Sequence, residues 1–109
     1  SSCAWMNGVP ELPAYSAAKA AIVGFTNSLA RQVGPDRIRV NAIAPAMVIT
    51  ERQRRLWYQD ESRIAAGRAR QALPDAIEPA DIARMGLFLA ADDSAMVTKQ
   101  CFIVSGGSR

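Results

Sequence analysis

Two short segments with the pattern of strands, each joined to the rest of the chain through a helical pattern, set the main constraint on the fold. They are residues 38–44, which end at Pro45, and residues 101–104. Strands joined through helices pair in parallel, and a parallel sheet is buried on both faces, which two strands alone do not achieve. The sequence therefore predicts an α/β fold in which these two strands belong to a larger sheet.

Two helices are indicated by apolar residues at three- and four-residue spacing. The first is expected over about residues 14–33, because Gly34 and Pro35 then end it. The second is expected over about residues 78–91, with Pro79 near its first position. The apolar positions are Ala18, Ile22, Phe25 and Leu29 in the first helix, and Ile82, Met85, Leu87, Phe88 and Leu89 in the second.

The length and the order of elements bear on domain organisation. The chain has 109 residues, which is enough for one domain. Residues 46–75 have a weaker pattern, which predicts one or two short helices in a mobile or substrate-facing segment. The first residues start without a lead-in element, as the end of a strand would. We therefore expect residues 1–109 to be the C-terminal part of a larger α/β domain.

The composition excludes several classes of function. The net charge is only +3 and the arginines are scattered, so no nucleic-acid partner is expected. The longest uncharged stretch, residues 40–50, is shorter than the roughly 20 apolar residues of a membrane span, so no membrane partner is expected. The chain has no histidine, which excludes Ser-His-Asp hydrolases and histidine-ligated metal sites. Cys3 and Cys101 lack metal-ligand spacing, so no metal is expected. Two cysteines without a disulfide pattern favour a reducing, cytoplasmic location.

A tyrosine and a lysine on the first helix are candidates for chemistry. Tyr15 and Lys19 are four residues apart and therefore share one helix face. Tyrosine is a poor base at neutral pH because its ordinary pKa is about 10, and a nearby ammonium group favours the phenolate. Ser2 precedes Tyr15 by 13 residues, and a strand end followed by a loop would bring its hydroxyl to the helix start.

Together with two further motifs, these residues resemble the short-chain dehydrogenase/reductase family. Residues 39–50 read Arg-Val-Asn-Ala-Ile-Ala-Pro-Ala-Met-Val-Ile-Thr, and the chain closes with Ser105 before Gly106 and Gly107. The resemblance runs from Ser2 to Gly107. It implies the C-terminal part of a Rossmann-type doubly wound parallel sheet, without the N-terminal dinucleotide-binding half. No glycine-rich phosphate-binding turn appears in the sequence.

The resemblance also assigns roles to individual residues. Ser2, Tyr15 and Lys19 match the catalytic serine, tyrosine and lysine of the family. The nicotinamide end of NAD or NADP is expected to contact Tyr15 and Lys19 together with three residues of the second motif. Those three residues are Pro45, Val48 and Thr50. The residues that distinguish NAD from NADP belong to the other half, so that choice stays open.

Within the family, residues 50–53, Trp57 and the start of the chain look most like bacterial aldose dehydrogenases. This implies an oxidoreductase that transfers a hydride between the CH–OH group of a sugar and NAD(P), with tyrosine as general base. Ser2, Trp5 and Tyr15 are the expected substrate contacts, and Asn7 or Trp57 are further candidates. Both tryptophans are equally consistent with core or interface packing.

Other readings stay open at this point. The substrate is alternatively a 3-oxoacyl thioester or a steroid, or the chain is an inactive piece that only oligomerises. The family implies a homo-oligomer, either a dimer or a homotetramer. Three residues depart from the family pattern: Ala46 replaces a glycine, Lys99 stands where a Thr-Gly pair is usual, and Ser105 replaces an aspartate. The Ala46 methyl group disfavours positive φ and fills space where the backbone approaches the cofactor.

Overall fold

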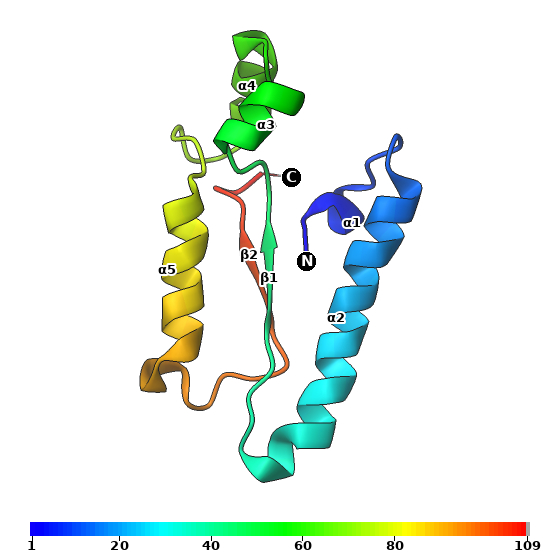
Figure 1. Cartoon of the computed structure of the whole chain (residues 1–109), viewed down its shortest axis with the longest axis vertical. Helices are drawn as coiled ribbons and strands as arrows, with labels where there is room; N and C mark the ends of the chain where they lie inside the picture. Colours follow the sequence, from blue (N-terminus) through cyan, green and yellow to red (C-terminus); the bar gives the residue numbers. More distant parts are fainter. Residues whose placement is uncertain (109) are drawn as a thin grey trace.

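The computed structural model describes residues 1–108 and has an α/β arrangement (Figure 1). Its elements are α1 (Ala4–Asn7), α2 (Pro13–Val33), a 3-10 turn (Gly34–Asp36), β1 (Ala42–Pro45), α3 (Glu51–Leu56), α4 (Glu61–Arg68), α5 (Pro79–Ala90), a second 3-10 turn (Asp92–Ser94) and β2 (Cys101–Val104). Strands β1 and β2 pair in parallel, with Ala42 opposite Cys101 and Pro45 opposite Val104. In Figure 1 the two strands run between α2 and α5. The expected parallel α/β arrangement is confirmed.

The first three residues lie along the edge of β1 that faces away from β2. The backbone nitrogens of Ser1 and Cys3 donate to the carbonyl oxygens of Ile43 and Pro45, at 2.9 and 3.0 Å. Bonds at every second residue are the pattern of neighbouring strands. Strand β1 is therefore hydrogen-bonded on both edges, as an interior strand of a sheet is.

The predicted start of the first strand is wrong by four residues. The sequence predicted a strand over 38–44, whereas the ladder of β1 begins at Ala42. Before that point the backbone nitrogen of Val40 donates to the Thr98 hydroxyl at 3.0 Å, and the Asn41 side chain bonds the same incoming segment. These side-chain bonds interrupt the backbone ladder, although the nitrogen of Lys99 still donates to the carbonyl of Val40 at 2.8 Å. Alternation of apolar residues does not reveal such an interruption.

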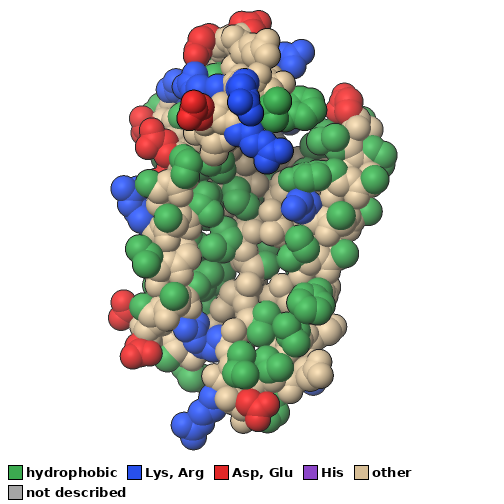
Figure 2. Space-filling view, in the orientation of Figure 1, with side chains coloured by type: hydrophobic (Ala, Val, Ile, Leu, Met, Phe, Trp, Pro, Cys, Tyr) green, Lys and Arg blue, Asp and Glu red, His purple; other side chains and the backbone are tan. Residues whose placement is uncertain are grey.

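Helix α2 begins at Pro13, where the missing N–H is not needed, and ends before the Gly34 turn. Within residues 1–108 its buried side chains are the small residues Thr26 and Ala30. Phe25, from the predicted apolar stripe, is 64% exposed. Figure 2 shows apolar side chains gathered along the edge of the molecule that α2 forms. The stripe located the helix correctly, but it is not the face that residues 1–108 bury.

Two short helices occupy the segment between β1 and α5, as the sequence predicted. Helix α3 is capped by the Thr50 hydroxyl, which accepts from the backbone nitrogen of Gln53 at 3.1 Å. Helix α4 is capped by the Asp60 carboxylate, which accepts from the backbone nitrogen of Ser62 at 2.9 Å. Figure 2 shows Lys and Arg side chains clustered around these helices.

Backbone hydrogen bonds join the later part of this segment to the loop after β1 and to the residues after β2. The nitrogen of Ile49 donates to the carbonyl of Ile77 at 3.0 Å. The carbonyl of Gly106, just beyond β2, accepts from the nitrogens of Ala72 and Leu73 at 2.8 and 2.9 Å. The loop after β1 and the residues after β2 are thereby held together at the carboxyl end of the strands.

The core of residues 1–108 is built of four small side chains and two isoleucines. Its buried apolar residues are Cys3, Ala30, Ala42, Ala44, Ile64 and Ile77. Larger apolar residues such as Leu87 and Ile103 are 71% and 53% exposed. Small buried side chains together with exposed large ones agree with strands that belong to a larger sheet. No helix in the described part of the chain is both long and apolar enough to cross a membrane.

Candidate active site

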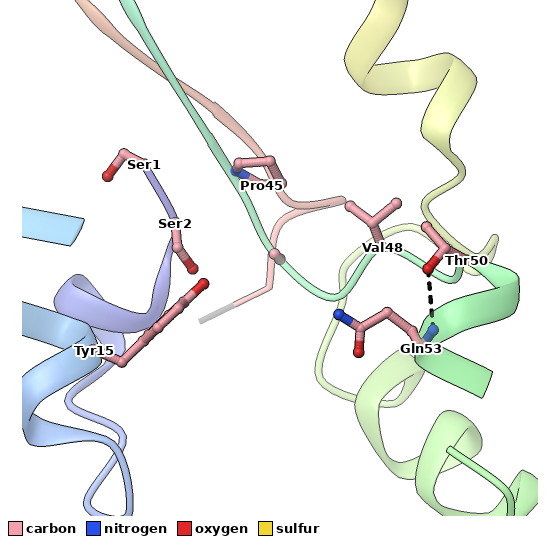
Figure 3. A pocket seen from close by; sticks show the side chains of 8 residues that line it. Ser1, Ser2, Tyr15, Pro45, Val48, Thr50 and Gln53 are labelled. Atoms are coloured by element: carbon pink, nitrogen blue, oxygen red, sulfur yellow. Dashed lines mark hydrogen bonds between the residues drawn. The ribbon is translucent and has the colours of Figure 1, made fainter. Parts of the chain in front are cut away.

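A cavity of about 190 Å³ lies at the carboxyl end of β1, between the start of α2 and the loop that leads into α3 (Figure 3). Ligands of open α/β sheets bind at this end of the strands. The cavity is lined by Ser1, Ser2, Tyr15, Pro45, Ala46, Val48, Thr50 and Gln53. The structure thus brings together five of the seven predicted site residues, from three separate parts of the chain.

The hydroxyl groups of Ser2 and Tyr15 point toward one another across one side of the cavity (Figure 3). Ser2 Oγ accepts a hydrogen bond from the backbone nitrogen of Ala4 at 3.3 Å, which leaves the hydroxyl proton free to be donated. Tyr15 lies in the first turn of α2 and is 44% exposed. A single substrate oxygen placed between these hydroxyls would contact both.

Lys19 does not line the cavity but lies beside Tyr15. Lys19 follows Tyr15 by one turn of α2, and its Nζ atom lies 5.1 Å from the centre of the Tyr15 ring. A cation within about 6 Å of an aromatic ring centre is attracted to the ring. The predicted pair is therefore in contact, with the lysine charge next to the phenol.

The opposite wall is made by the end of β1 and the loop after it, which contribute Pro45, Ala46, Val48 and Thr50. The Thr50 hydroxyl accepts the α3 cap bond and keeps its proton free for a ligand. Residue Ala46 donates its N–H to the carbonyl of Val104 at 3.1 Å, and it is not among the residues with positive φ. The alanine therefore adds a methyl group to the wall without backbone strain.

Neither tryptophan lies in this cavity. Trp5 is part of α1, and its Nε1 atom is buried without a hydrogen-bond partner among residues 1–108. Trp57 follows α3 and is 63% exposed. Asn7 lines a separate cavity of about 700 Å³, together with Ile103 and Ser105. The structure therefore does not bring the expected sugar platform to Ser2 and Tyr15.

Gln53 lines the cavity but was not among the residues predicted from the sequence. Its side chain extends from α3 toward the side on which Ser2 and Tyr15 lie (Figure 3). The signal for it was present, because a residue three positions after a helix cap lies in the first turn, next to the capping side chain. Recognising Thr50 as a cap would have placed Gln53 beside it.

The two remaining departures from the family pattern have local explanations. Lys99 has φ 61°, a left-handed conformation that glycine adopts without strain. The Ser105 hydroxyl accepts from the backbone nitrogen of Gly107 at 3.2 Å. An aspartate side chain closes such turns in the same way, so serine keeps the hydrogen bond without the charge.

The comparison with protein families agrees with this geometry. A family model described as "Enoyl-(Acyl carrier protein) reductase" matches residues 1–109, the whole chain. The chain belongs to the short-chain dehydrogenase/reductase family. Among curated members, the probable galactose dehydrogenase GalD of Rhizobium meliloti (strain 1021) is 53% identical over 107 residues. The D-xylose 1-dehydrogenase of Caulobacter vibrioides (strain NA1000 / CB15N) is 41% identical over 110 residues.

Solved structures of short-chain dehydrogenases share the fold of the chain. The 3-oxoacyl-[acyl-carrier protein] reductase from Brucella melitensis ATCC 23457 has a TM-score of 0.90 at 34% identity, over 99% of this chain and 40% of that one. A 4-hydroxyisoleucine dehydrogenase complexed with NADH has a TM-score of 0.90 at 29% identity, over 98% of this chain and 44% of that one. The galactose and xylose enzymes are matched over 98% and 99% of this chain, which spans 41% and 43% of their lengths.

Proposed function

We propose that this chain is the catalytic segment of an oxidoreductase that transfers a hydride between the CH–OH group of an aldose and NAD or NADP. The observation that carries the proposal is that the Ser2 and Tyr15 hydroxyls face one another in a cavity at the carboxyl end of β1, with Thr50 in the opposite wall. The similarity to galactose and xylose dehydrogenases supports an aldose as substrate.

The far wall of the cavity suits the nicotinamide end of such a cofactor. Pro45, Ala46 and Val48 offer small apolar groups to a flat ring, and the Thr50 hydroxyl is free to donate to a carboxamide oxygen. Tyr15 and Lys19 lie on the other side, where a ribose hydroxyl would be held. When bound, the nicotinamide supplies the hydride acceptor or donor. The residues that hold the diphosphate are expected outside this segment.

The proposed mechanism uses Ser2 and Tyr15 on the same substrate oxygen. In its phenolate form, Tyr15 takes the proton of the substrate hydroxyl while the carbon loses a hydride to the cofactor. The carbon becomes a carbonyl, which is a lactone when the carbon is anomeric. The Ser2 hydroxyl donates a hydrogen bond to the oxygen throughout, and the Lys19 cation stabilises the phenolate.

The role of Tyr15 is tested by Tyr15→Phe in the complete enzyme, which joins this segment to a dinucleotide-binding half. Removing a general base costs about 10²–10⁴-fold in rate. Because Tyr15 is 44% exposed and the ring is kept, we expect an intact fold with turnover reduced by that factor. Tyr58→Phe, on the α3–α4 connection, is the matched control and should keep full turnover. Full activity in Tyr15→Phe would refute the assignment.

The choice of substrate is tested with a panel of free aldoses, 3-oxoacyl thioesters and steroid alcohols. The acyl alternative has support of its own in the likeness to a 3-oxoacyl-[acyl-carrier protein] reductase, at 34% identity. We expect the highest kcat/KM with an aldose. A strong preference for an acyl thioester or a steroid would overturn the sugar assignment and leave the hydride-transfer site in place.

The remaining alternative is an inactive piece that persists by association. Its support is the exposure of apolar side chains, Phe25 on α2 and Ile103 on β2, which could pack against other subunits. The proposed enzyme is itself a homodimer or homotetramer, so such contacts are expected in either case. Titration of the isolated chain with NAD and NADP separates the two readings. A folded, oligomeric chain without cofactor binding would be structural. We place the enzyme in the cytoplasm, where the free thiols of Cys3 and Cys101 stay reduced.

A further inference from the structure

Two serine hydroxyls join the segment that carries Ser2 to helix α2. Ser1 Oγ donates to the carbonyl oxygen of Lys19 at 2.8 Å, and Ser16 Oγ donates to the carbonyl oxygen of Ala4 at 3.4 Å. The two bonds run in opposite directions between the same two pieces of backbone. We call this pair of bonds the serine latch.

The residues of the latch lie next to Ser2 on the first segment and next to Tyr15 on α2. On the segment after the strand edge, its anchor residues Ser1 and Ala4 lie on either side of Ser2 in sequence. On α2, Ser16 follows Tyr15 directly and Lys19 is four residues from it. A shift of α2 relative to the segment therefore cannot change the approach of Ser2 to Tyr15 without lengthening a latch bond.

The backbone hydrogen bonds of residues 1–3 hold only one side of this arrangement. Backbone bonds from Ser1 to Ile43 and from Cys3 to Pro45 hold the segment against β1. They set its position in the sheet but not its position relative to α2. Helix α2 also packs against α1 and β1, and its buried side chains Thr26 and Ala30 are small. Among the hydrogen bonds of residues 1–108, the two latch bonds are those that join residues 1–4 directly to α2.

The Ser1 hydroxyl is committed to the latch rather than to the cavity. Figure 3 shows that it points away from the Ser2 and Tyr15 hydroxyls, although Ser1 borders the cavity. A carbonyl oxygen has two lone pairs, so Lys19 accepts from Ser1 and still accepts the helical bond from the next turn. The bond thus links strand edge and helix without weakening α2.

We propose that Ser1 and Ser16 are positioning residues that set the placement of the Ser2 hydroxyl relative to the Tyr15 hydroxyl. This rests on the proposed function, since it deepens the account of the same site. Neither residue contacts the substrate oxygen. Displacement of a catalytic group by about 1 Å can cost on the order of a hundredfold in rate. The wall formed by Pro45, Val48 and Thr50 is separate from the latch, so ligand binding should change little.

The sharpest test compares Ser1→Thr with Ser1→Val in the complete enzyme, because these side chains have nearly the same shape and differ by the hydroxyl. We expect Ser1→Thr to stay near the wild-type kcat and Ser1→Val to lose about tenfold in kcat, with the KM of substrate and cofactor nearly unchanged. Ser16→Ala should lower kcat less, because its bond is longer. Ser28→Ala, exposed on the same helix, is the control and should have no effect.

The outcomes separate this proposal from the proposed function. Equal kcat values for Ser1→Thr and Ser1→Val would overturn the latch, as would a loss that appears only in KM. A loss of kcat in Ser28→Ala equal to that in Ser16→Ala would also overturn it. If Ser1→Val does not fold, the comparison of Ser16→Ala with Ser28→Ala decides. Full activity in Tyr15→Phe removes both proposals, whereas an enzyme that needs Tyr15 but tolerates Ser1→Val removes this one alone.

Discussion

The ammonium nitrogen of Lys19 lies 5.1 Å from the centre of the Tyr15 ring, and the carbonyl oxygen of the same lysine receives the Ser1 hydroxyl at 2.8 Å. One residue therefore serves the site in two ways. Its side chain places a positive charge beside the phenol, and its backbone holds the strand edge that carries Ser2. Substitutions of the side chain change only the first of these, so the two contributions can be separated.

Lys19→Met keeps most of the length of the side chain and the backbone carbonyl but removes the charge. We expect kcat to fall by about 10–100-fold at neutral pH, because the phenolate loses its stabilising cation. Steady-state kinetics of the complete enzyme measures this. Lys99→Met, at the only other lysine of the chain, is the control and lies far along the sequence in the loop before β2. Equal activity of Lys19→Met and wild type would contradict the role of the charge.

Gln53→Ala tests whether the amide that faces Ser2 and Tyr15 contacts a ligand. The side chain lines the cavity, whereas the backbone nitrogen caps onto Thr50, so alanine keeps the cap and removes only the amide. We expect the KM of the substrate to rise by about tenfold, equivalent to one hydrogen bond, with a smaller change in kcat. Gln32→Ala, exposed near the end of α2, is the control. A rise confined to the KM of the cofactor would move the contact to the cofactor instead.

The sequence predicted the helices and the second strand well because their signals are local. Pro13 and Gly34 mark the ends of α2, and β2 coincides with the predicted 101–104. The first strand was placed too early because residues 38–41 alternate like a strand, whereas their hydrogen-bond partners include side chains such as Thr98. That pairing spans about half the chain and leaves no periodic trace.

The candidate site shows the same division between local and distant information. Tyr15 and Lys19 follow from spacing on one helix, and Thr50 follows from a contiguous motif. Trp5 was expected to contact the sugar as an apolar platform, but it lies in the short helix α1 and does not line the cavity. Gln53 follows locally from the Thr50 cap, whereas its side chain reaches the cavity because α3 begins just beyond the carboxyl end of β1, which the sequence pattern does not show.

Gly107→Ala should loosen the connection between α4 and α5. Gly107 has φ +77°, and a Cβ atom there would lie 2.7 Å from the Cβ of Ala72, whose backbone is bonded to Gly106. We expect a loss of about 1–3 kcal/mol in the free energy of unfolding and faster proteolysis near Ala72. Gly24→Ala is the control, because it lies within α2 with open space around its Cα and should be neutral or stabilising.

Lys99→Gly should stabilise the protein. Lys99 has φ 61°, where a side chain costs about 1–2 kcal/mol, and glycine gives back about 0.5–1 kcal/mol of this through greater freedom in the unfolded chain. The expected net gain is about 0.5–1 kcal/mol in the free energy of unfolding, measured by urea denaturation. The neighbouring Gln100→Gly, at a residue without positive φ, should instead destabilise. A loss of stability in Lys99→Gly would show that its side chain contributes more than its backbone costs.

The buried thiol of Cys3 should make stability depend on alkaline pH. Burial, with a smaller contribution from Cys101, raises the pKa of the Cys3 thiol above its ordinary value of about 9.0, and the thiol donates to the carbonyl of Ala44 at 3.2 Å. The folded state therefore favours the protonated thiol. Its contribution is complete below pH 9 and is lost as the pH rises from the unfolded pKa through the folded pKa.

Urea denaturation of wild type and Cys3→Ala between pH 7 and pH 10.5 measures this dependence. The wild type should lose stability above about pH 9 more steeply than Cys3→Ala, whatever their difference at pH 7. Cys101→Ala is the control and should keep most of the wild-type slope. Iodoacetamide should also alkylate Cys3 far more slowly in the native protein than after unfolding, because the thiol is only 3% exposed. Parallel stability curves for wild type and Cys3→Ala would mean that the thiolate is tolerated beside the Ala44 carbonyl.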